Sequence, residues 1–399
     1  GVYHRWSRDA RLYGEFNLSN KEQLTGKEGV RGRGFKIEFA PDKAIFSVHI
    51  GTSKLPAYPL LKSAGISDDE MEKAWGKRVL ALNRQTGAKA DRTYGKFYKL
   101  VHGELPENPE DHRALFGEHL LRAELDPETT KSTLGKSFKT ANGDTLMRSM
   151  RRMLEISKGN DQVDNKSSME FQSVNGAEDL IAGRVIRDTA AIHRKLRWNL
   201  DKRNTLRKVV PSNTVDKSIM GFFQQSLANE PDQTNPLGML AGQTMTTILG
   251  EQGGISNPYA VLDEAKLLHS SQFGFLDPIR TPEGDKTGIT LSLALGSEKE
   301  GTRIKARFRN AKTGKMIKIG PEDTAGKVVS FPDQYEKGTP RSKRIKALKD
   351  GEIAYVHPDE VDYILPSPRA VFGISANLIP FLQNNQGNRS MTAAKQAEQ

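Results

Sequence analysis

The sequence predicts an α+β protein with more than one domain. Its 399 residues exceed what one compact core commonly holds, so two or three domains are expected. Strict alternation of apolar and polar residues in 35–50 indicates strands, whereas apolar residues at helical spacing in 144–157 and 177–199 indicate helices. Elements of both kinds therefore occur along one chain.

The first 120 residues contain one hairpin signal and two helix-start signals. Apolar residues alternate on both sides of a Pro41–Asp42 turn, which predicts a β-hairpin over 35–50: Phe35, Ile37, Phe39, Phe46, Val48 and Ile50. Ser67 with Glu70 three residues later forms a capping box, so a helix is expected from there through about Leu82. Asn108 before Pro109 starts a second predicted helix, which continues through Leu120.

Two longer helices are predicted in the middle of the chain. Residues 144–157 form the first, and the polar residues 157–176 read as a connection. The second spans 177–199, with a stripe expected to be buried: Ile181, Val185, Ile192 and Leu196. Its end and the following turn carry more cations than a helix dipole requires, which suits contact with a phosphate backbone: Arg194, Lys195, Arg197, Lys202, Arg203, Arg207 and Lys208.

Regular periodicity is weaker after residue 220. Residues 221–290 are rich in Gly, Pro, Asn and Thr and predict a long, loop-rich segment. Residues 297–356 predict short basic strands such as Arg303–Phe308 and Lys327–Phe331. A short apolar element at 370–382 and a polar tail able to form a helix end the chain.

Charge and residue composition exclude several classes of function. The formal net charge of +11 favours a polyanionic partner, although an ordinary basic surface has the same charge. The absence of cysteine excludes disulfides, thiolate catalysis and cysteine-ligated zinc. The eight histidines show no HxxxH or HExxH spacing, so no transition-metal site is expected. No apolar run approaches the length of a membrane span.

Three collinear blocks carry a family resemblance. Residues 269–284, HSSQFGFLDPIRTPEG, resemble without a gap the HPTHYGRICPIETPEG signature of the second-largest (β) subunit of multisubunit DNA-directed RNA polymerases. Upstream, Asp232–Leu237 and the glycines of 250–254 resemble that family's DQNNPL and LGPGG. Downstream, Pro358–Tyr363, Ile379–Leu382 and the Asn388–Arg389 pair resemble PSEVDY, LIPFL and NR.

The amino-terminal half fits the same order with shorter matches. Gly1–Tyr3 resembles the end of RSPGVYF, and Lys54–Ala57 resembles part of RKLPAT. The resemblance implies the amino-terminal half of a β subunit, and Gly in place of Met at residue 1 suggests a processed chain or a fragment. Divergence throughout favours a large bacteriophage whose β subunit is split between polypeptides.

The alignment with the family implies five regions. They are a lobe-like domain at 1–157, part of the protrusion at 158–222, a fork region with the TPEG motif at 223–295, a β-rich external region at 296–366, and the start of the active-centre, hybrid-binding region at 367–399.

The resemblance also implies contact residues, which are expected to bind and position and not to catalyse. Asn388 and Arg389 match the pair that contacts the incoming nucleotide. The residue types suit that role, since Arg offers a fork of donors to phosphate and Asn can bond a ribose hydroxyl. Expected RNA or hybrid contacts are Asn229, Asp232, Asn235, Thr247, Glu283, Lys286 and Gln399. A DNA fork loop is expected at Gly253, Gly254, Ser256 and Asn257.

Some of these assignments have structural alternatives. Asn235 before Pro236 is equally suited to capping a helix or turn, and Glu283 to an internal hydrogen bond. The family usually has Arg where Phe275 stands, Glu where Arg280 stands and Pro-Asn at 285–286. Charges around the TPEG turn are therefore rearranged, so contacts cannot be transferred one by one there.

Nucleotidyl transfer needs Mg²⁺ held by clustered aspartates, which this sequence lacks. The resemblance places that Mg²⁺ on a β′-like partner, so the chain alone is expected to be inactive. Expected partners are template DNA, nascent RNA, NTPs, a carboxyl-terminal β-like chain, the β′-like chain and a promoter-specificity factor. The protein is expected in the host cytoplasm or packaged in a virion, and no membrane partner is expected. The alternatives are a non-catalytic, basic, DNA-binding structural protein and a single-subunit polymerase or nuclease.

Overall fold

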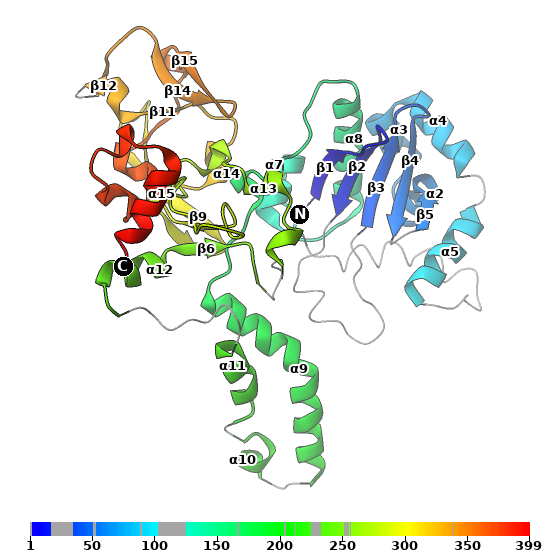
Figure 1. Ribbon diagram of the computed structural model, residues 1–399. Helices are drawn as coiled ribbons and strands as arrows, with labels where there is room; N and C mark the ends of the chain where they lie inside the picture. The colour runs from blue at the N-terminus through cyan, green and yellow to red at the C-terminus, as the bar shows by residue number, and fades with distance from the viewer. Residues whose placement is uncertain are drawn as a thin grey trace. The chain divides into compact units, whose positions relative to one another are not determined.

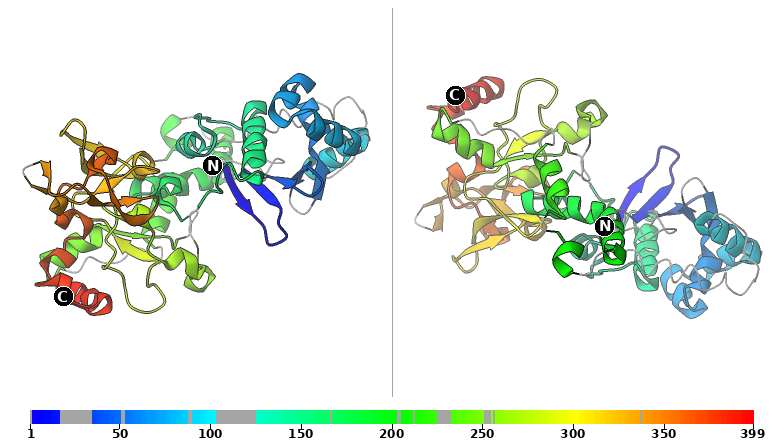
Figure 2. Two further views of the ribbon diagram at one scale, coloured as in Figure 1. Left: turned by 90° about the horizontal axis from the view of Figure 1, so that it is seen from above. Right: turned by 90° about the horizontal axis from the view of Figure 1, so that it is seen from below.

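The chain folds into two units, Gly1–Lys166 and Ser167–Gln399, each with its own core. The computed structural model describes residues 2–16, 35–50, 53–87, 90–102, 125–165, 167–202, 205–211, 213–224, 233–250, 255, 257–336 and 338–399 (Figure 1). Both units combine helices with antiparallel strands (Figure 2), so the α+β, multidomain prediction is confirmed.

The first unit is built on a five-stranded antiparallel sheet in chain order. Its strands are β1 (Val2–Trp6), β2 (Leu12–Phe16), β3 (Phe35–Ala40), β4 (Ile45–Ile50) and β5 (Ser53–Pro56). The predicted hairpin is β3–β4, and its register pairs Phe39 with Phe46. Alternation placed these aromatic residues on the buried face, so the hairpin prediction is confirmed.

Six helices accompany this sheet in the described part of the unit: α2 (Ala57–Ser63), α3 (Asp68–Trp75), α4 (Lys77–Thr86), α5 (Ala90–His102), α7 (Pro127–Leu134) and α8 (Gly143–Ser157). The Ser67–Glu70 capping box is present, but the single helix expected through Leu82 is wrong. Gly76, at φ +82°, separates α3 from α4 because a left-handed residue cannot continue a right-handed helix. The helix predicted from Asn108 lies outside the described residues.

Helix α8 confirms the prediction for 144–157. Asn142 caps it by accepting a hydrogen bond from the Thr145 amide at 3.0 Å. The residues at helical spacing are buried in the core of the first unit: Leu146, Met150, Met153 and Leu154. This apolar stripe packs against the sheet, which explains why local periodicity sufficed to predict the helix.

The second unit begins with the predicted connection and the predicted long helix. Between the end of α8 and α9 (Ala177–Lys202), the described residues form turns and one 3₁₀ element, η1 (Met169–Phe171). Helices α10 (Leu206–Val209) and α11 (Asp216–Phe223) return along α9 (Figure 1). The stripe of Ile181, Val185, Ile192 and Leu196 is only half-buried, since these two short helices cover α9 incompletely. The expectation of a buried stripe is thus wrong in degree.

A seven-stranded sheet forms the body of the second unit, in the order β10-β9-β16-β11-β14-β15 with β8 also paired to β9. The strands are β8 (Glu298–Glu300), β9 (Arg303–Asn310), β10 (Met316–Ile319), β11 (Val329–Ser330), β14 (Ile345–Lys349), β15 (Glu352–Val356) and β16 (Tyr363–Ile364). The strands expected in 297–356 are therefore present, and β11–β16 is a parallel pair.

Short elements complete the second unit. Two small ladders pair β6 (Met245–Thr247) with β7 (Thr290–Ser292), and β12 (Tyr335–Glu336) with β13 (Thr339–Pro340). The α-helices are α12 (Pro236–Gln243), α13 (Asp263–Lys266), α14 (Pro321–Thr324) and α15 (Gly387–Gln396). The 3₁₀ turns are η2 (Pro258–Ala260), η3 (Ser270–Gln272), η4 (Pro332–Gln334), η5 (Pro358–Glu360), η6 (Pro368–Val371), η7 (Ala376–Leu378) and η8 (Leu382–Asn384).

One hydrophobic core joins distant segments of this unit. Met169, Phe275, Phe308 and Leu365 belong to the same buried cluster, and the Phe275 and Phe308 rings are 5.4 Å apart between centroids. These residues come from three of the five regions expected from the alignment, 158–222, 223–295 and 296–366. The packing shows two compact units, and the finer five-region division stays a prediction.

Candidate functional site

The segment containing the TPEG motif forms a tightly bonded turn. Thr281 Oγ1 donates to the carbonyl oxygen of Thr290 at 2.9 Å and accepts from the Gly288 amide at 2.9 Å. Gly288 has φ +72°, and a Cβ there would lie 2.2 Å from the carbonyl oxygen of Lys266. The turn therefore requires glycine at 288, and it presents Glu283 and Lys286 to solvent.

Helix α15 lies beside this turn. Thr392 Oγ1 donates to Glu283 Oε1 at 2.7 Å, while Ser390 and Ala394 are the helix's buried anchors. Glu283 thus makes the internal hydrogen bond that the sequence left open, and it remains exposed. Asn388 and Arg389 occupy the first turn of α15, exposed, and neither side chain has a polar partner among the described residues. Two groups expected to bind substrate are thereby left available.

The other end of α15 is held by a buried ion pair. Arg280 Nε donates to Glu398 Oε1 at 2.6 Å and its NH2 group donates to Oε2; the two side chains are 10% and 11% exposed. Ser375 Oγ adds a hydrogen bond to Glu398 Oε1 at 2.7 Å. The cation at 280, which departs from the family pattern, therefore has a carboxylate partner within the chain. Gln399 follows directly and is exposed.

Asn235 joins α12 to the same end of α15. Its Oδ1 accepts from the Leu237 amide at 2.9 Å, capping α12, and its Nδ2 donates to the Ala397 carbonyl at 3.2 Å. A Cβ on Gly238 would lie 2.8 Å from the Glu398 carbonyl oxygen, so α12 packs closely here. Sequence reasoning saw the capping potential of Asn235 but did not predict α12.

Thr247 and Asn257 lie on two further segments near the turn. Thr247 is exposed on β6, opposite Thr290, and its Oγ1 is 3.1 Å from that of Thr290. Asn257 is exposed and caps η2 by accepting from the Tyr259 amide at 3.0 Å. Tyr259 Oη donates to Asp285 Oδ2 at 2.6 Å, which ties η2 to the TPEG turn and raises the pKa of Tyr259. Lys286 is next along the turn.

Five expected contact residues lie outside the described residues: Asn229, Asp232, Gly253, Gly254 and Ser256. The other expected residues lie on segments that contact the TPEG turn or α15. The turn at 281–288 connects to the middle of α15 through Glu283 and to η2 through Asp285, and Arg280 just before it connects to the end of α15, which contacts α12. Their roles in binding are not established by this proximity and stay predictions.

Asp277 is a structural residue that sequence reasoning missed. It is fully buried, and its carboxylate accepts from the Ile279 amide at 2.8 Å and the Gly373 amide at 2.7 Å. Burial raises the pKa of Asp277, although these backbone hydrogen bonds oppose that effect. The Asp277 carboxylate therefore fastens the TPEG-containing segment to residues just before η7. An Asp inside an otherwise apolar run, FGFLDPI, was the available signal.

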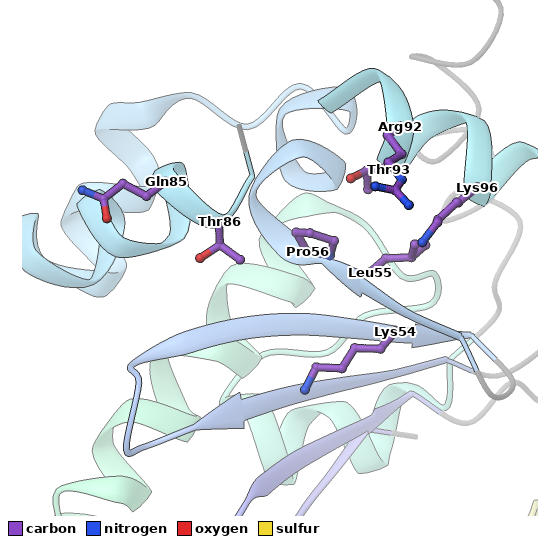
Figure 3. A pocket seen from close by; sticks show the side chains of 8 residues that line it. All are labelled: Lys54, Leu55, Pro56, Gln85, Thr86, Arg92, Thr93 and Lys96. Atoms are coloured by element: carbon purple, nitrogen blue, oxygen red, sulfur yellow. The ribbon is translucent and has the colours of Figure 1, made fainter. Parts of the chain in front are cut away.

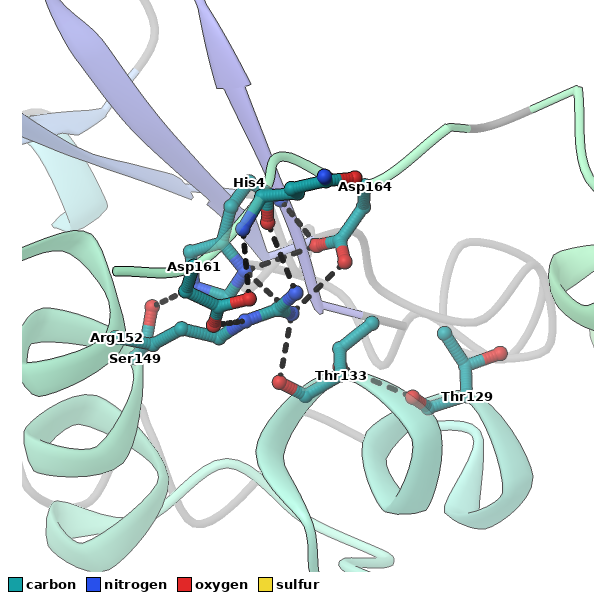
Figure 4. A network of polar contacts seen from close by, with 8 residues as sticks. His4, Thr129, Thr133, Ser149, Arg152, Asp161 and Asp164 are labelled. Carbon is teal, nitrogen blue, oxygen red and sulfur yellow. Dashed lines mark hydrogen bonds and ion pairs between the residues drawn. The ribbon is translucent and has the colours of Figure 1, made fainter. Parts of the chain in front are cut away.

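A buried polar network in the first unit has the residue types of a catalytic triad (Figure 4). His4 Nε2 lies 2.9 Å from Ser149 Oγ, and His4 Nδ1 lies 2.9 Å from Asp164 Oδ2. His4 and Ser149 are fully buried, so no substrate carbonyl can reach the hydroxyl. Arg152 donates to Asp164 Oδ1 at 2.8 Å, which completes a structural connection between β1, α8 and the end of the unit.

The described ranges contain neither a metal-ligand cluster nor a membrane-spanning helix. No group of three or more metal-ligating side chains there is placed to hold a metal ion. None of the helices in those ranges is both long enough and apolar enough to cross a membrane.

Comparison with known proteins agrees with the motif blocks. Residues 231–298 match the family model described as RNA polymerase Rpb2, domain 3. The whole chain is 24% identical, over 442 aligned positions, to the DNA-directed RNA polymerase subunit beta of Prochlorococcus marinus (strain NATL1A), 38% of which is covered.

Two further relatives carry the same description. The subunit beta of Chlorobaculum tepidum is 28% identical over 62% of this chain and 20% of the relative. That of Thermus aquaticus is 30% identical over 48% of this chain and 18% of the relative. The chain thus spans at most 38% of the length of these relatives. The similarity supports a β-like polymerase subunit.

Proposed function

We propose that this chain is the amino-terminal half of a β subunit in a multisubunit, DNA-dependent RNA polymerase. In that enzyme it positions the incoming NTP, the RNA 3′ end and downstream DNA. A β′-like partner holds the catalytic Mg²⁺, and this chain alone has no activity. Its low identity to bacterial relatives supports a large bacteriophage with a divided β subunit, whose enzyme works in the host cytoplasm or is packaged in the virion.

The observation that carries the proposal is the hydrogen bond between Thr392 and Glu283. It places α15, whose first turn carries Asn388 and Arg389, beside the TPEG turn, although 109 residues separate the bonded pair in sequence. Two segments that resemble separate motifs of one family therefore lie together. An exposed guanidinium and amide at that place suit a triphosphate and a ribose hydroxyl.

Exposed apolar side chains support the need for partner subunits. Large apolar residues with at least a third of their surface exposed gather in the segment 239–268 and recur just after η7: Met239, Leu240, Met245, Ile248, Ile255, Tyr259, Leu262, Leu267, Leu268 and Phe381. Exposed apolar side chains in this number are typical of surfaces that a partner protein covers. We assign it to the carboxyl-terminal β-like and β′-like chains.

Reconstitution tests the proposal. The chain should copurify with β-like and β′-like chains and transcribe only when assembled. In that assembly Arg389→Ala should raise the NTP KM by about tenfold, the loss of one charge-assisted phosphate contact. Asn388→Ala should reduce discrimination between ribo- and deoxyribonucleotides.

Lys395→Ala is the matched control, since Lys395 is an exposed cation in the last turn of the same helix. It should leave the KM within twofold. Equal effects of the two substitutions would refute a nucleotide contact by Arg389. A chain that binds DNA but never joins such partners would instead support the alternative, a basic DNA-binding structural protein.

A further inference from the structure

A basic cavity lies in the first unit beside β5, α4 and α5 (Figure 3). Its volume is about 370 Å³, and it is lined by Lys54, Leu55, Pro56, Gln85, Thr86, Arg92, Thr93 and Lys96. Small-ligand sites commonly measure roughly 300–1,000 Å³, so the cavity suits a small group. Three of its lining residues are cations and none is a carboxylate, which favours an anionic ligand.

Two of the three cations have no counter-charge within the part of the chain that the structure describes. Arg92 and Lys96 are exposed, and neither is paired with another residue that the structure describes. They are one helical turn apart on α5, and both lean toward Leu55 (Figure 3). Lys54 differs, because its Nζ donates to Glu38 at 2.7 Å and its side chain extends away from the other two. The uncompensated charge therefore belongs to α5.

The arrangement of Arg92 and Lys96 is slightly unfavourable without a ligand. Like charges four residues apart on a helix repel one another, and an anion between them removes that repulsion. A guanidinium presents a planar fork of donors that fits phosphate oxygens, and an ammonium group adds a point charge. Arg92 also lies in the first turn of α5, where the helix dipole is positive.

Neutral groups complete the lining. Leu55 is 2% exposed and with Pro56 forms an apolar part of the cavity, whereas Gln85 offers an amide. Thr86 Oγ1 donates its hydrogen to the Leu82 carbonyl at 3.0 Å, so the Gln85 amide is the neutral donor of the two. A phosphate with an attached organic group has both kinds of contact available here.

We propose that this cavity binds a phosphate group. Its source is either a small phosphorylated molecule such as a nucleotide or the backbone of a nucleic acid. This inference concerns the first unit alone and does not depend on the proposed polymerase function.

Calorimetric titration of the full chain tests the proposal with two probes, inorganic pyrophosphate and a twelve-nucleotide DNA duplex. The test variant is Arg92→Gln with Lys96→Gln. The matched control is Lys99→Gln, an exposed lysine on the same helix that does not line the cavity. Circular dichroism and the melting midpoint verify folding, and the two single variants repeat the comparison if the double variant is unstable.

We expect at least one probe to bind at least tenfold more weakly to the double variant and within twofold of wild type to Lys99→Gln. Gln85→Trp distinguishes the sources, since it fills the cavity without changing its charge. Loss of pyrophosphate binding in Gln85→Trp indicates a small ligand. Binding of the duplex alone, dependent on Arg92 and Lys96, indicates a nucleic-acid backbone. If neither probe binds, or if Lys99→Gln weakens binding as much as the double variant, the proposal is overturned.

Discussion

Arg280 Nε donates a hydrogen bond to Glu398 Oε1 at 2.6 Å, across 118 residues of sequence. Both side chains are nearly buried, at 10% and 11% exposure. The pair closes the TPEG-containing segment against the end of α15. It also explains how the chain accommodates a cation at a position where the family resemblance leads one to expect a carboxylate.

Removing one partner of this pair should destabilise the second unit. Arg280→Met leaves the Glu398 carboxylate buried without a cation, at a cost of roughly 3 kcal/mol in the free energy of unfolding. Arg280→Met combined with Glu398→Leu should recover much of that loss. Urea unfolding with hydrogen exchange at α15 amides measures both effects. A double variant less stable than the single variant would contradict this account.

Two glycines of the TPEG region should respond differently to alanine. Both have positive φ, so each substitution strains the backbone by roughly 1–2 kcal/mol. Only at Gly288 would the added Cβ collide with backbone, 2.2 Å from the Lys266 carbonyl, whereas nothing lies within 4 Å at Gly284. Gly288→Ala should therefore lower the melting midpoint more than Gly284→Ala. The reverse order would show that the turn has another conformation.

Glu38 should make the first unit sensitive to acid. Burial alone would raise its pKa, but hydrogen bonds from Lys54 and Arg11 outweigh burial and lower the pKa to about 2. Because the folded pKa lies below the unfolded value of about 4.5, the stabilisation is present above pH 4.5 and is lost as pH falls toward 2. The stabilisation amounts to roughly 1–2 kcal/mol, after allowance for the solvent that screens the exposed cations paired with Glu38.

The measurement is the free energy of unfolding from pH 6 to pH 2.5 for wild type and Glu38→Gln. The difference between them should shrink as pH falls. Glu128→Gln is the control, since that carboxylate is exposed in the first turn of α7 in the same unit. A constant difference between wild type and Glu38→Gln across this range would contradict the assignment.

Ser149 should prove structural and unreactive. Ser149→Ala leaves the buried His4 Nε2 without its partner, which should cost about 1–3 kcal/mol. Ser157→Ala on the same helix should cost little, since that hydroxyl is partly exposed and donates to the local Leu154 carbonyl three residues earlier. Chemical denaturation compares the two. A fluorophosphonate probe should leave native Ser149 unlabelled, and labelling would show that the network is accessible.

Sequence patterns predicted the elements whose signals are local. The β3–β4 hairpin and α8 were found because alternation and helical spacing report directly which face is buried. The break at Gly76 was missed because a single glycine within a helical pattern is often tolerated. Helix α12 was missed because Asn235 and Pro236 signal a turn as well as a helix start.

By itself, the sequence determined an α+β chain, the β3–β4 hairpin of the first unit, α8 and α9, and the motif blocks that resemble a polymerase β subunit. Only the tertiary structure placed Glu283 beside Thr392, Arg280 on Glu398 and Asn235 on Ala397. These partners are 109 to 162 residues apart. Their pairing depends on the path of the intervening chain around a shared core, and no local periodicity records that path.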